Sequence, residues 1–231
     1  MNVYDPAAGS WSRGRDIPFP VDDAVSGVWR DSLVVLVSGW RNDGSVDRVQ
    51  WYDPATDRWM QATPIPGRPV FGHAGAVVGD QIVYVDGAAT VDDTRRFALD
   101  TAAWIGDVMP EDPAAVTWAL LGEHPLPGLY RAAGGSVGGL ALFVGGTENP
   151  YNYDGIGYDG VPSEPIRQVL AFAPRAGEWR NLAAPPLATM DHRALGVAGG
   201  KVFLVGGMEE GQAVSSKVWY AEVKELLASI W

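Results

Sequence analysis

The chain has 231 residues with a formal charge of −11, 29 Gly, 10 Trp and no Cys. This glycine content exceeds the usual value of roughly 7%, so the fold needs many sharp turns, and the absence of Cys excludes disulfides, thiolate metal sites and cysteine nucleophiles. Because an acidic chain is repelled by phosphate groups, nucleic acids and anionic membranes are not expected as partners.

The first residues, MNVYDPAAGS, contain no basic stretch followed by an apolar one, as a secretory signal would. No segment approaches 18 uninterrupted apolar residues, so membrane insertion is not expected. We therefore expect a soluble chain that is cytoplasmic as the sequence stands.

A turn followed by a tryptophan recurs along the chain. In three of its four copies a proline lies five residues before the tryptophan, and the other copy is looser. Because a tryptophan brings about 150–250 Å² of surface to bury, each is predicted to plug the space between adjacent sheets. The copies are Val3–Pro6 before Trp11, Trp51–Pro54 before Trp59, Trp104–Asp107 before Trp118 and Ala171–Pro174 before Trp179.

Four apolar, β-rich runs each end in a pair of small or turn-forming residues, with a period of about 50 residues plus insertions. The second member of each pair is always glycine, which permits a tight backbone turn. Because these runs are apolar on both faces, they are predicted to be buried by neighbouring sheets. The pairs are Ser38-Gly39, Asp86-Gly87, Gly145-Gly146 and Gly206-Gly207.

Each repeat contains short β-rich runs bounded by Gly, Pro, Asp and Asn. In the third repeat the predicted strands, here lettered a to d, cover residues 131–137, 140–144, 168–173 and 178–182. We expect a single domain over 1–231, with a partial unit at 2–17. The full units cover 22–64, 70–122 and 130–183, and the last unit, 190–224, lacks a tryptophan-marked strand d.

These spaced features together resemble kelch repeats. The resemblance implies an all-β fold, a kelch-type β-propeller of four-stranded antiparallel blades, with about four blades plus a partial N-terminal blade. It also places the chain near the galactose-oxidase type of propeller. The copper radical cofactor of those oxidases needs a Cys-linked Tyr, which this chain cannot form, and we expect no cofactor.

Two features depart from the kelch pattern. Ser38 and Asp86 replace the first glycine of the pair, so the first two blades are expected to be degenerate copies. Kelch propellers have about six or seven blades, within the general range for propellers, whereas this chain has four a–b hairpins. Either the propeller is incomplete or unusually small, which we favour, or the Trp11 strand completes the last blade and closes the ring.

The loops at one face of a propeller are where binding is expected, because the strands are committed to packing. The d–a and b–c loops share a face, and the longest of them is the b–c loop from Thr147 to Pro165. A loop of this length is either a recognition surface or a self-packed plug. Its candidate binding residues are Asn149, Tyr151, Asn152, Tyr153 and Tyr158, and the first b–c loop adds Trp40, Arg41 and Asn42.

The d–a loops of this face carry the basic residues Arg68, Arg131 and Arg193, and His192 precedes the last of these. Three guanidinium groups around one axis could hold a carboxylate. The alternative, which we favour, is that each arginine bonds carbonyl or carboxylate groups of neighbouring blades. No His spacing typical of a metal site occurs, so no metal is expected.

Two functions fit these patterns. The first is a non-enzymatic binding module that recognises a protein or a glycan on the face with the d–a and b–c loops. The second is a carbohydrate enzyme similar to the bacterial kelch sialic-acid mutarotases, in which the three arginines would hold the substrate carboxylate and His192 or a nearby acid would transfer protons. We favour the binding module, and we assign no catalytic residues.

Overall fold

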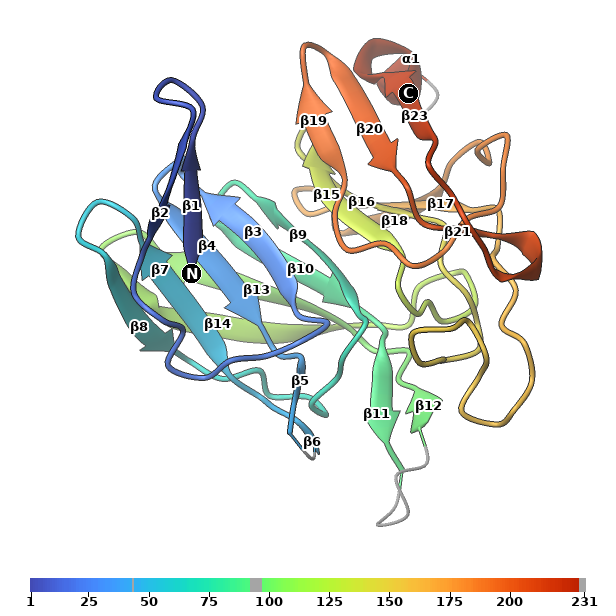
Figure 1. Ribbon diagram of the computed structural model, residues 1–231, viewed down its shortest axis with the longest axis horizontal. Coiled ribbons are helices and arrows are strands. Elements are labelled where there is room, and N and C mark those ends of the chain that lie inside the picture. The colour runs from blue at the N-terminus through green and yellow to red at the C-terminus, as the bar shows by residue number, and fades with distance from the viewer. Residues whose placement is uncertain (43, 92–96, 229–231) are drawn as a thin grey trace.

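The computed structural model describes residues 1–42, 44–91 and 97–228. Its strands form antiparallel sheets that follow one another in chain order around a common centre, as blades of a propeller do (Figure 1). Hydrophobic clusters fill the space between consecutive sheets, and one of them joins Val35 and Trp51 of the first sheet to Ile82 and Val116 of the second. The predicted all-β propeller architecture is confirmed.

Among the described residues, three blades have four strands and the last has three. Blade 1 contains β3 (Val25–Trp29), β4 (Leu33–Val37), β7 (Val49–Asp53) and β8 (Arg58–Ala62). Blade 2 contains β9 (Ala74–Val78), β10 (Gln81–Val85), β13 (Ala103–Met109) and β14 (Asp112–Gly122). Blade 3 contains β15 (Ala133–Val137), β16 (Leu140–Val144), β17 (Val169–Ala173) and β18 (Glu178–Asn181). Blade 4 contains β19 (Gly196–Ala198), β20 (Lys201–Val205) and β23 (Val218–Glu222), followed by α1 (Val223–Ala228).

Three small hairpins extend the loops between the second and third strands of blades 1, 2 and 4. They follow the same strand in each blade and so lie on the same face of the propeller; in Figure 1 the hairpins of blades 1 and 2 are at the bottom and that of blade 4 is at the right. The hairpins are β5 (Trp40–Arg41) with β6 (Gly44–Ser45), β11 (Ala88–Thr90) with β12 (Phe97–Leu99), and β21 (Met208–Glu209) with β22 (Ala213–Val214), the last pair joined by the 3₁₀ turn η1 (Glu210–Gln212). No described helix is long and apolar enough to cross a membrane.

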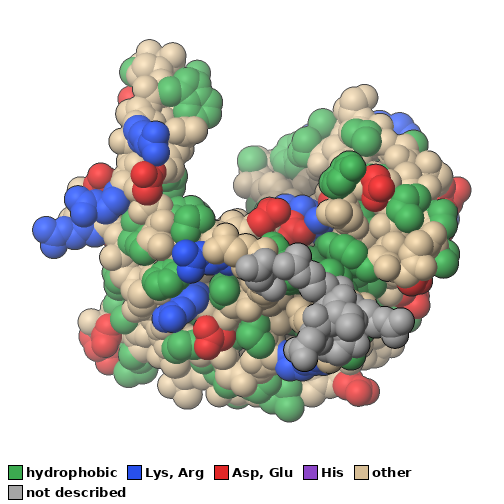
Figure 2. Space-filling model, turned by 60° about the horizontal axis from the view of Figure 1, so that its bottom comes forward, with side chains coloured by type: hydrophobic (Ala, Val, Ile, Leu, Met, Phe, Trp, Pro, Cys, Tyr) green, Lys and Arg blue, Asp and Glu red, His purple; other side chains and the backbone are tan. Residues whose placement is uncertain are grey.

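The N-terminal hairpin of β1 (Asn2–Asp5) and β2 (Ser10–Arg13) does not complete the last blade. Within the described chain its strands pair with each other alone, and β23 pairs with β20 alone. The hairpin projects beside blade 1, across a hollow from blade 4 (Figure 2). The prediction that Trp11 is a buried plug is therefore wrong: it is 71% exposed, and its hairpin pairs with no further strand among the described residues.

The other three tryptophans of the repeat do connect blades. Each lies on strand d and contacts the chain segment that directly follows the fourth strand of the preceding unit. An indole N–H that bonds a carbonyl while its ring covers apolar neighbours satisfies both parts of the side chain. The contacts are Trp59 Nε1 to Arg15 O at 3.1 Å, Trp118 Nε1 to Thr63 O at 3.2 Å and the Trp179 ring to the His124 ring at 5.5 Å.

The first strands of the blades approach one another closely around a central hollow of about 360 Å³. Glycine permits this approach, since a Cβ on Gly134 would overlap the backbone of Gly75, and one on Gly75 would overlap Val25. Gly134 and Gly135 are thus residues of β15, within the strand predicted over residues 131–137.

The small pair after the second strand has the same backbone geometry in all four blades. The first residue has φ between 54° and 68° and the second between 92° and 104°. The left-handed conformation of the first residue is compatible with the polar residues Ser38 and Asp86 as well as with glycine. The side chains of Ser38 and Asp86 bond the loop that enters the next blade. Ser38 Oγ lies 2.8 Å from Val70 O, and Asp86 Oδ2 accepts the Leu129 N–H at 2.9 Å. The degenerate pairs therefore connect adjacent blades.

Candidate functional site

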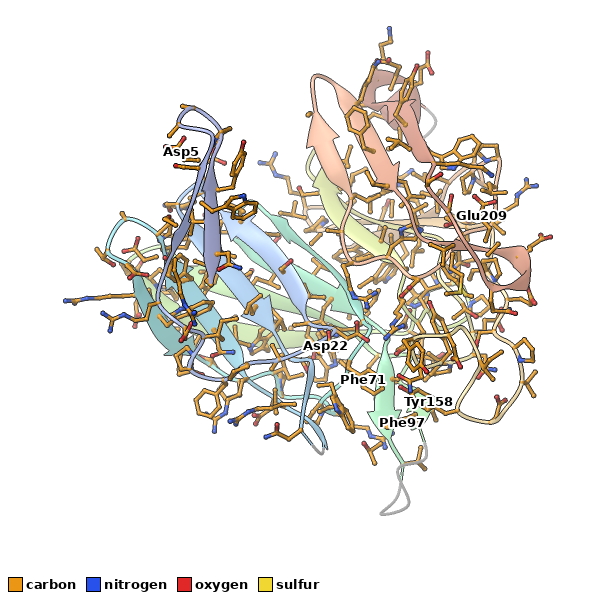
Figure 3. All side chains as sticks on the ribbon, in the orientation of Figure 1. Asp5, Asp22, Phe71, Phe97, Tyr158 and Glu209 are labelled. Carbon is orange, nitrogen blue, oxygen red and sulfur yellow. The ribbon has the colours of Figure 1, made fainter. Side chains whose placement is uncertain are left out.

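A pocket of about 500 Å³ lies on the face that carries the small hairpins. The loops that enter blades 1, 2 and 3, two of the hairpins and the long loop after β16 all contribute to it. Figure 3 shows four of its residues, Asp22, Phe71, Phe97 and Tyr158, gathered on this side of the molecule. Its lining residues are Asp22, Asp23, Trp40, Phe71, Phe97, Arg131, Asn152 and Tyr158.

One wall of the pocket is aromatic. The ring centroids of Trp40, Phe71 and Phe97 lie 5.1–5.4 Å apart, all in edge-to-face arrangements. The Tyr158 ring packs on Phe97 at 4.4 Å and is 40% exposed. Aromatic rings arranged in this way support one another through their quadrupoles, so the wall is well ordered and still open to a ligand.

Backbone pairing holds this wall in place. The Asp22 and Trp40 backbones exchange two hydrogen bonds, of 2.8 and 2.7 Å, and Phe71 and Ala88 do the same at 3.0 and 2.8 Å. Each entering loop is thereby fixed to the hairpin of its own blade. The Gly72 N–H also donates to Asp23 O at 2.9 Å, which connects the loop of blade 2 to that of blade 1.

An ion-pair network closes the other side of the pocket. Arg131 donates from Nε and Nη2 to Asp23 Oδ2 at 3.1 and 2.6 Å, and from Nη1 to Asn152 O at 2.9 Å and Asp191 Oδ1 at 3.2 Å. Arg193 also pairs with both Asp23 and Asp191. The network joins the loops that enter blades 1, 3 and 4, so it spans the end of the propeller axis.

The charge around the pocket is asymmetric. The two arginines are shared between Asp23 and Asp191, whereas Asp22 forms no ion pair with any residue that the structure describes. Within the described part of the chain, three carboxylates thus face two guanidinium groups. Burial raises the pKa of Tyr158, and the negative charges of Asp23 and Asp22 add to the effect, although Arg131 opposes it.

The long loop after β16 is packed on itself and also contributes to the pocket. Ser163 Oγ donates to Asn149 O at 2.8 Å, and Asn149 Nδ2 donates to Asp159 Oδ1 at 3.1 Å. Tyr151 is fully buried against Tyr130, with ring centroids 5.4 Å apart. The loop thus has the internal packing of a plug while presenting Tyr158 at the surface.

The structure brings together four of the residues proposed from sequence, namely Trp40, Arg131, Asn152 and Tyr158. The other candidates of the two loops lie outside the pocket lining. Tyr153 is 80% exposed, Asn42 lies in the exposed turn after β5, and the Arg41 guanidinium lies over the Phe19 ring at 5.2 Å.

The three predicted arginines do not share one pocket. Arg68 donates to Thr90 O at 2.9 Å and lines a separate hollow, while Arg131 and Arg193 are bound to carboxylates. His192 is buried, its Nε2 lies 2.8 Å from Thr189 Oγ1, and burial lowers its pKa to about 4. Arg131 and Arg193 thus bind a carboxylate of another blade, as the favoured alternative expects, whereas Arg68 bonds a carbonyl of its own blade.

Four residues of the pocket were not among the site residues proposed from sequence, namely Asp22, Asp23, Phe71 and Phe97. The isolated bridges place Asp22, Phe71, Tyr130 and Met190 at one repeat position. Alignment of the entering loops at this position would have identified Phe71. Nothing in the repeat pattern identifies Phe97, because its hairpin is an insertion.

Sequence and structure comparisons find kelch proteins and a similar fold. Kelch-like protein terF of Aspergillus terreus is 26% identical over 219 residues, which are 89% of this chain and 44% of that protein. Kelch-like protein 36 of Bos taurus is 24% identical over 219 residues, 93% of this chain and 32% of that protein. The chain thus spans less than half the length of either relative.

No protein-family model matches the chain. The solved structure of YjhT superposes with a TM-score of 0.75 at 14% identity, covering 93% of this chain and 70% of YjhT, and this similarity concerns the fold alone. The blades, the recurring glycine after each second strand and the kelch-like relatives lead to one conclusion. The chain is a kelch-repeat β-propeller.

Proposed function

We propose that this propeller is a protein-interaction module that binds a segment of a partner protein in the pocket between Trp40 and Tyr158. One observation carries the proposal: loops of three blades form a concave aromatic wall beside the buried ion pair of Arg131 and Asp23. Aromatic side chains in concave positions dominate the energy of many protein interfaces. A preorganised site also loses less conformational entropy when the ligand binds.

The related kelch-like proteins support a role in protein interaction, and they do not specify the ligand. The size of the pocket favours one or two inserted side chains, because pockets of about 300–1,000 Å³ accommodate groups of that size. The surrounding loops would contact the backbone of the bound segment. This mode resembles the insertion of an anchor residue into a preformed site.

The test is selection from a displayed random-peptide library with the immobilised chain as bait. Peptides selected by the wild type should lose at least tenfold in affinity for Tyr158→Ala, as measured by fluorescence polarisation, because a partly exposed wall residue is removed. The same peptides should bind Tyr153→Ala with unchanged affinity, since that side chain belongs to the same loop but lies outside the pocket lining.

Circular dichroism and thermal unfolding must show that both variants retain the fold. Equal losses in Tyr158→Ala and Tyr153→Ala would indicate that the long loop as a whole, and not the pocket, binds the peptide. A library that yields no pocket-dependent peptide would argue against the proposed function.

A further inference from the structure

Asp22 gives the pocket a negative charge that none of the described residues neutralises through an ion pair. The Asp22 carboxylate accepts the Asp23 N–H at 2.8 Å, and it has no ion-pair partner among the described residues. In contrast, Asp23 is almost fully buried and bound by two arginines. Among the described residues that line this pocket, Asp22 is therefore the carboxylate that a charged group of a ligand meets without an ion-pair partner.

The aromatic wall lies in the same pocket as this carboxylate. Trp40, Phe97 and Tyr158 keep part of their surface accessible, and Asp22 is joined to Trp40 by the backbone bridge. A cation over the face of an aromatic ring is attracted by the ring quadrupole, and tryptophan gives the strongest effect. A carboxylate beside such rings adds a charge-assisted hydrogen bond to the same cation.

Arg131 does not make the pocket a receptor for anions. It is 8% exposed, and its guanidinium already donates to Asp23, Asn152 O and Asp191. A ligand carboxylate would have to displace one of these partners and would then lie close to Asp22. Displacing the Asp23 carboxylate would leave a buried charge without its partner, which is costly.

We infer that the pocket binds the cationic side chain of an arginine or lysine in the partner protein, with its charge at Asp22 and its stem against the aromatic wall. This inference rests on the proposed function and specifies its ligand. The formal charge of −11 on the chain complements a basic segment and would accelerate its association at low ionic strength.

Three synthetic peptides test the inference: acetyl-Gly-Arg-Gly-amide, its citrulline counterpart and its glutamate counterpart. Citrulline has nearly the shape of arginine without its charge. Binding is followed through the indole N–H signal of Trp40 in a ¹⁵N-labelled sample, assigned with Trp40→Phe. The arginine peptide should bind at least fivefold more tightly than the citrulline peptide, and the glutamate peptide should not shift the Trp40 signal.

Asp22→Asn identifies the group that recognises the charge. Asparagine retains an oxygen that accepts the Asp23 N–H, so the loop should keep its conformation. The affinity for the arginine peptide should fall about three- to tenfold, while the affinity for the citrulline peptide should not change. Asp31→Asn is the matched control, because Asp31 is an exposed carboxylate in the β3–β4 turn outside the pocket lining.

The two proposals fail in different ways. Equal affinities for the arginine and citrulline peptides, or equal effects of Asp22→Asn and Asp31→Asn, would overturn the cationic assignment. If library peptides still depend on Tyr158 but carry no basic residue, the binding module stands and the cationic ligand is wrong. If neither the library nor the tripeptides detect binding at the pocket, the proposed function itself is wrong.

Discussion

Asp23 and Arg131 are separated by 108 residues in the sequence, yet Asp23 Oδ2 lies 2.6 Å from Arg131 Nη2 in a buried ion pair. Because Arg193 binds the same carboxylate, Asp23 connects the loops that enter blades 1, 3 and 4. Two of these loops, those that enter blades 1 and 3, line the pocket. One carboxylate at the edge of the pocket therefore joins two of its walls.

Asp23→Asn should destabilise the protein strongly. The substitution leaves Arg131 buried beside Asp191 as its remaining carboxylate in the described structure, and breaking a buried ion pair costs about 3–5 kcal/mol. Urea denaturation followed by tryptophan fluorescence measures the loss. Asp22→Asn, a change at the adjacent residue, should alter the free energy of unfolding by less than about 1 kcal/mol; equal losses in the two variants would show that the network does not stabilise the fold.

Gly72→Ala should disrupt the pocket through Tyr130. Gly72 has φ +61°, and a Cβ at this position would overlap the Tyr130 ring. Gly79 has φ +59° with open space around it, so Gly79→Ala carries the backbone strain without the overlap. We expect a loss of about 1 kcal/mol for Gly79→Ala and a clearly larger one for Gly72→Ala, measured by chemical denaturation. A smaller loss for Gly72→Ala than for Gly79→Ala would contradict the packing described around Tyr130.

Much of the fold follows from the sequence because its signals are local. Residues 140–144 were predicted as a strand and form β16, since the apolar run and the following small pair specify a buried strand and its turn. Glycine recurs as the second residue of the pair for the same reason in each blade, because the φ angle there lies near +100°. An L-residue adopts this conformation only with strain.

The pocket was less predictable because it depends on distances between blades. The positive charges of Arg131 and Arg193 suggested a site for an anion, but both are neutralised by carboxylates from distant parts of the chain. Phe97 joins the wall through a hairpin that the repeat does not contain. Trp11 has the sequence pattern of a buried anchor, and it is exposed because burial requires a neighbouring sheet.

Trp118→Ala should destabilise the protein more than Trp11→Ala, because Trp118 connects two blades whereas Trp11 is an exposed copy of the same motif. The Trp118 ring packs against Tyr84 at 5.7 Å, and its Nε1 donates to Thr63 O. We expect a loss of about 2–3 kcal/mol for Trp118→Ala and less than about 1 kcal/mol for the 71% exposed Trp11. Thermal unfolding with calorimetry compares them, and similar losses would refute the different roles assigned to these tryptophans.

The stability of the protein should decrease in acid because of His73. Burial lowers the pKa of His73 to about 3 from its ordinary value of 6.5. Between these values the unfolded chain binds a proton that the folded chain does not. The free energy of unfolding therefore falls as the pH is lowered, by up to about 1.4 kcal/mol per pH unit from this group.

His73→Phe removes this titration and keeps a ring against Tyr84, which lies 5.6 Å from the His73 ring. Urea denaturation at pH 6.5, 5.5 and 4.5 should give a shallower pH dependence in the variant than in the wild type. The comparison of slopes does not depend on how much the substitution changes stability at neutral pH. Identical slopes would mean that His73 does not remain neutral in the folded protein.

Binding of the partner at the loop face can be measured through the indole N–H signals of the ten tryptophans during titration with a library-selected peptide. Trp40 lines the pocket, whereas Trp11 and Trp219 lie on β2 and β23, outside it. If the loop face binds the partner, the Trp40 signal shifts in proportion to peptide bound while those of Trp11 and Trp219 stay in place. A peptide that saturates the protein without moving Trp40 would place binding elsewhere and contradict the proposed site.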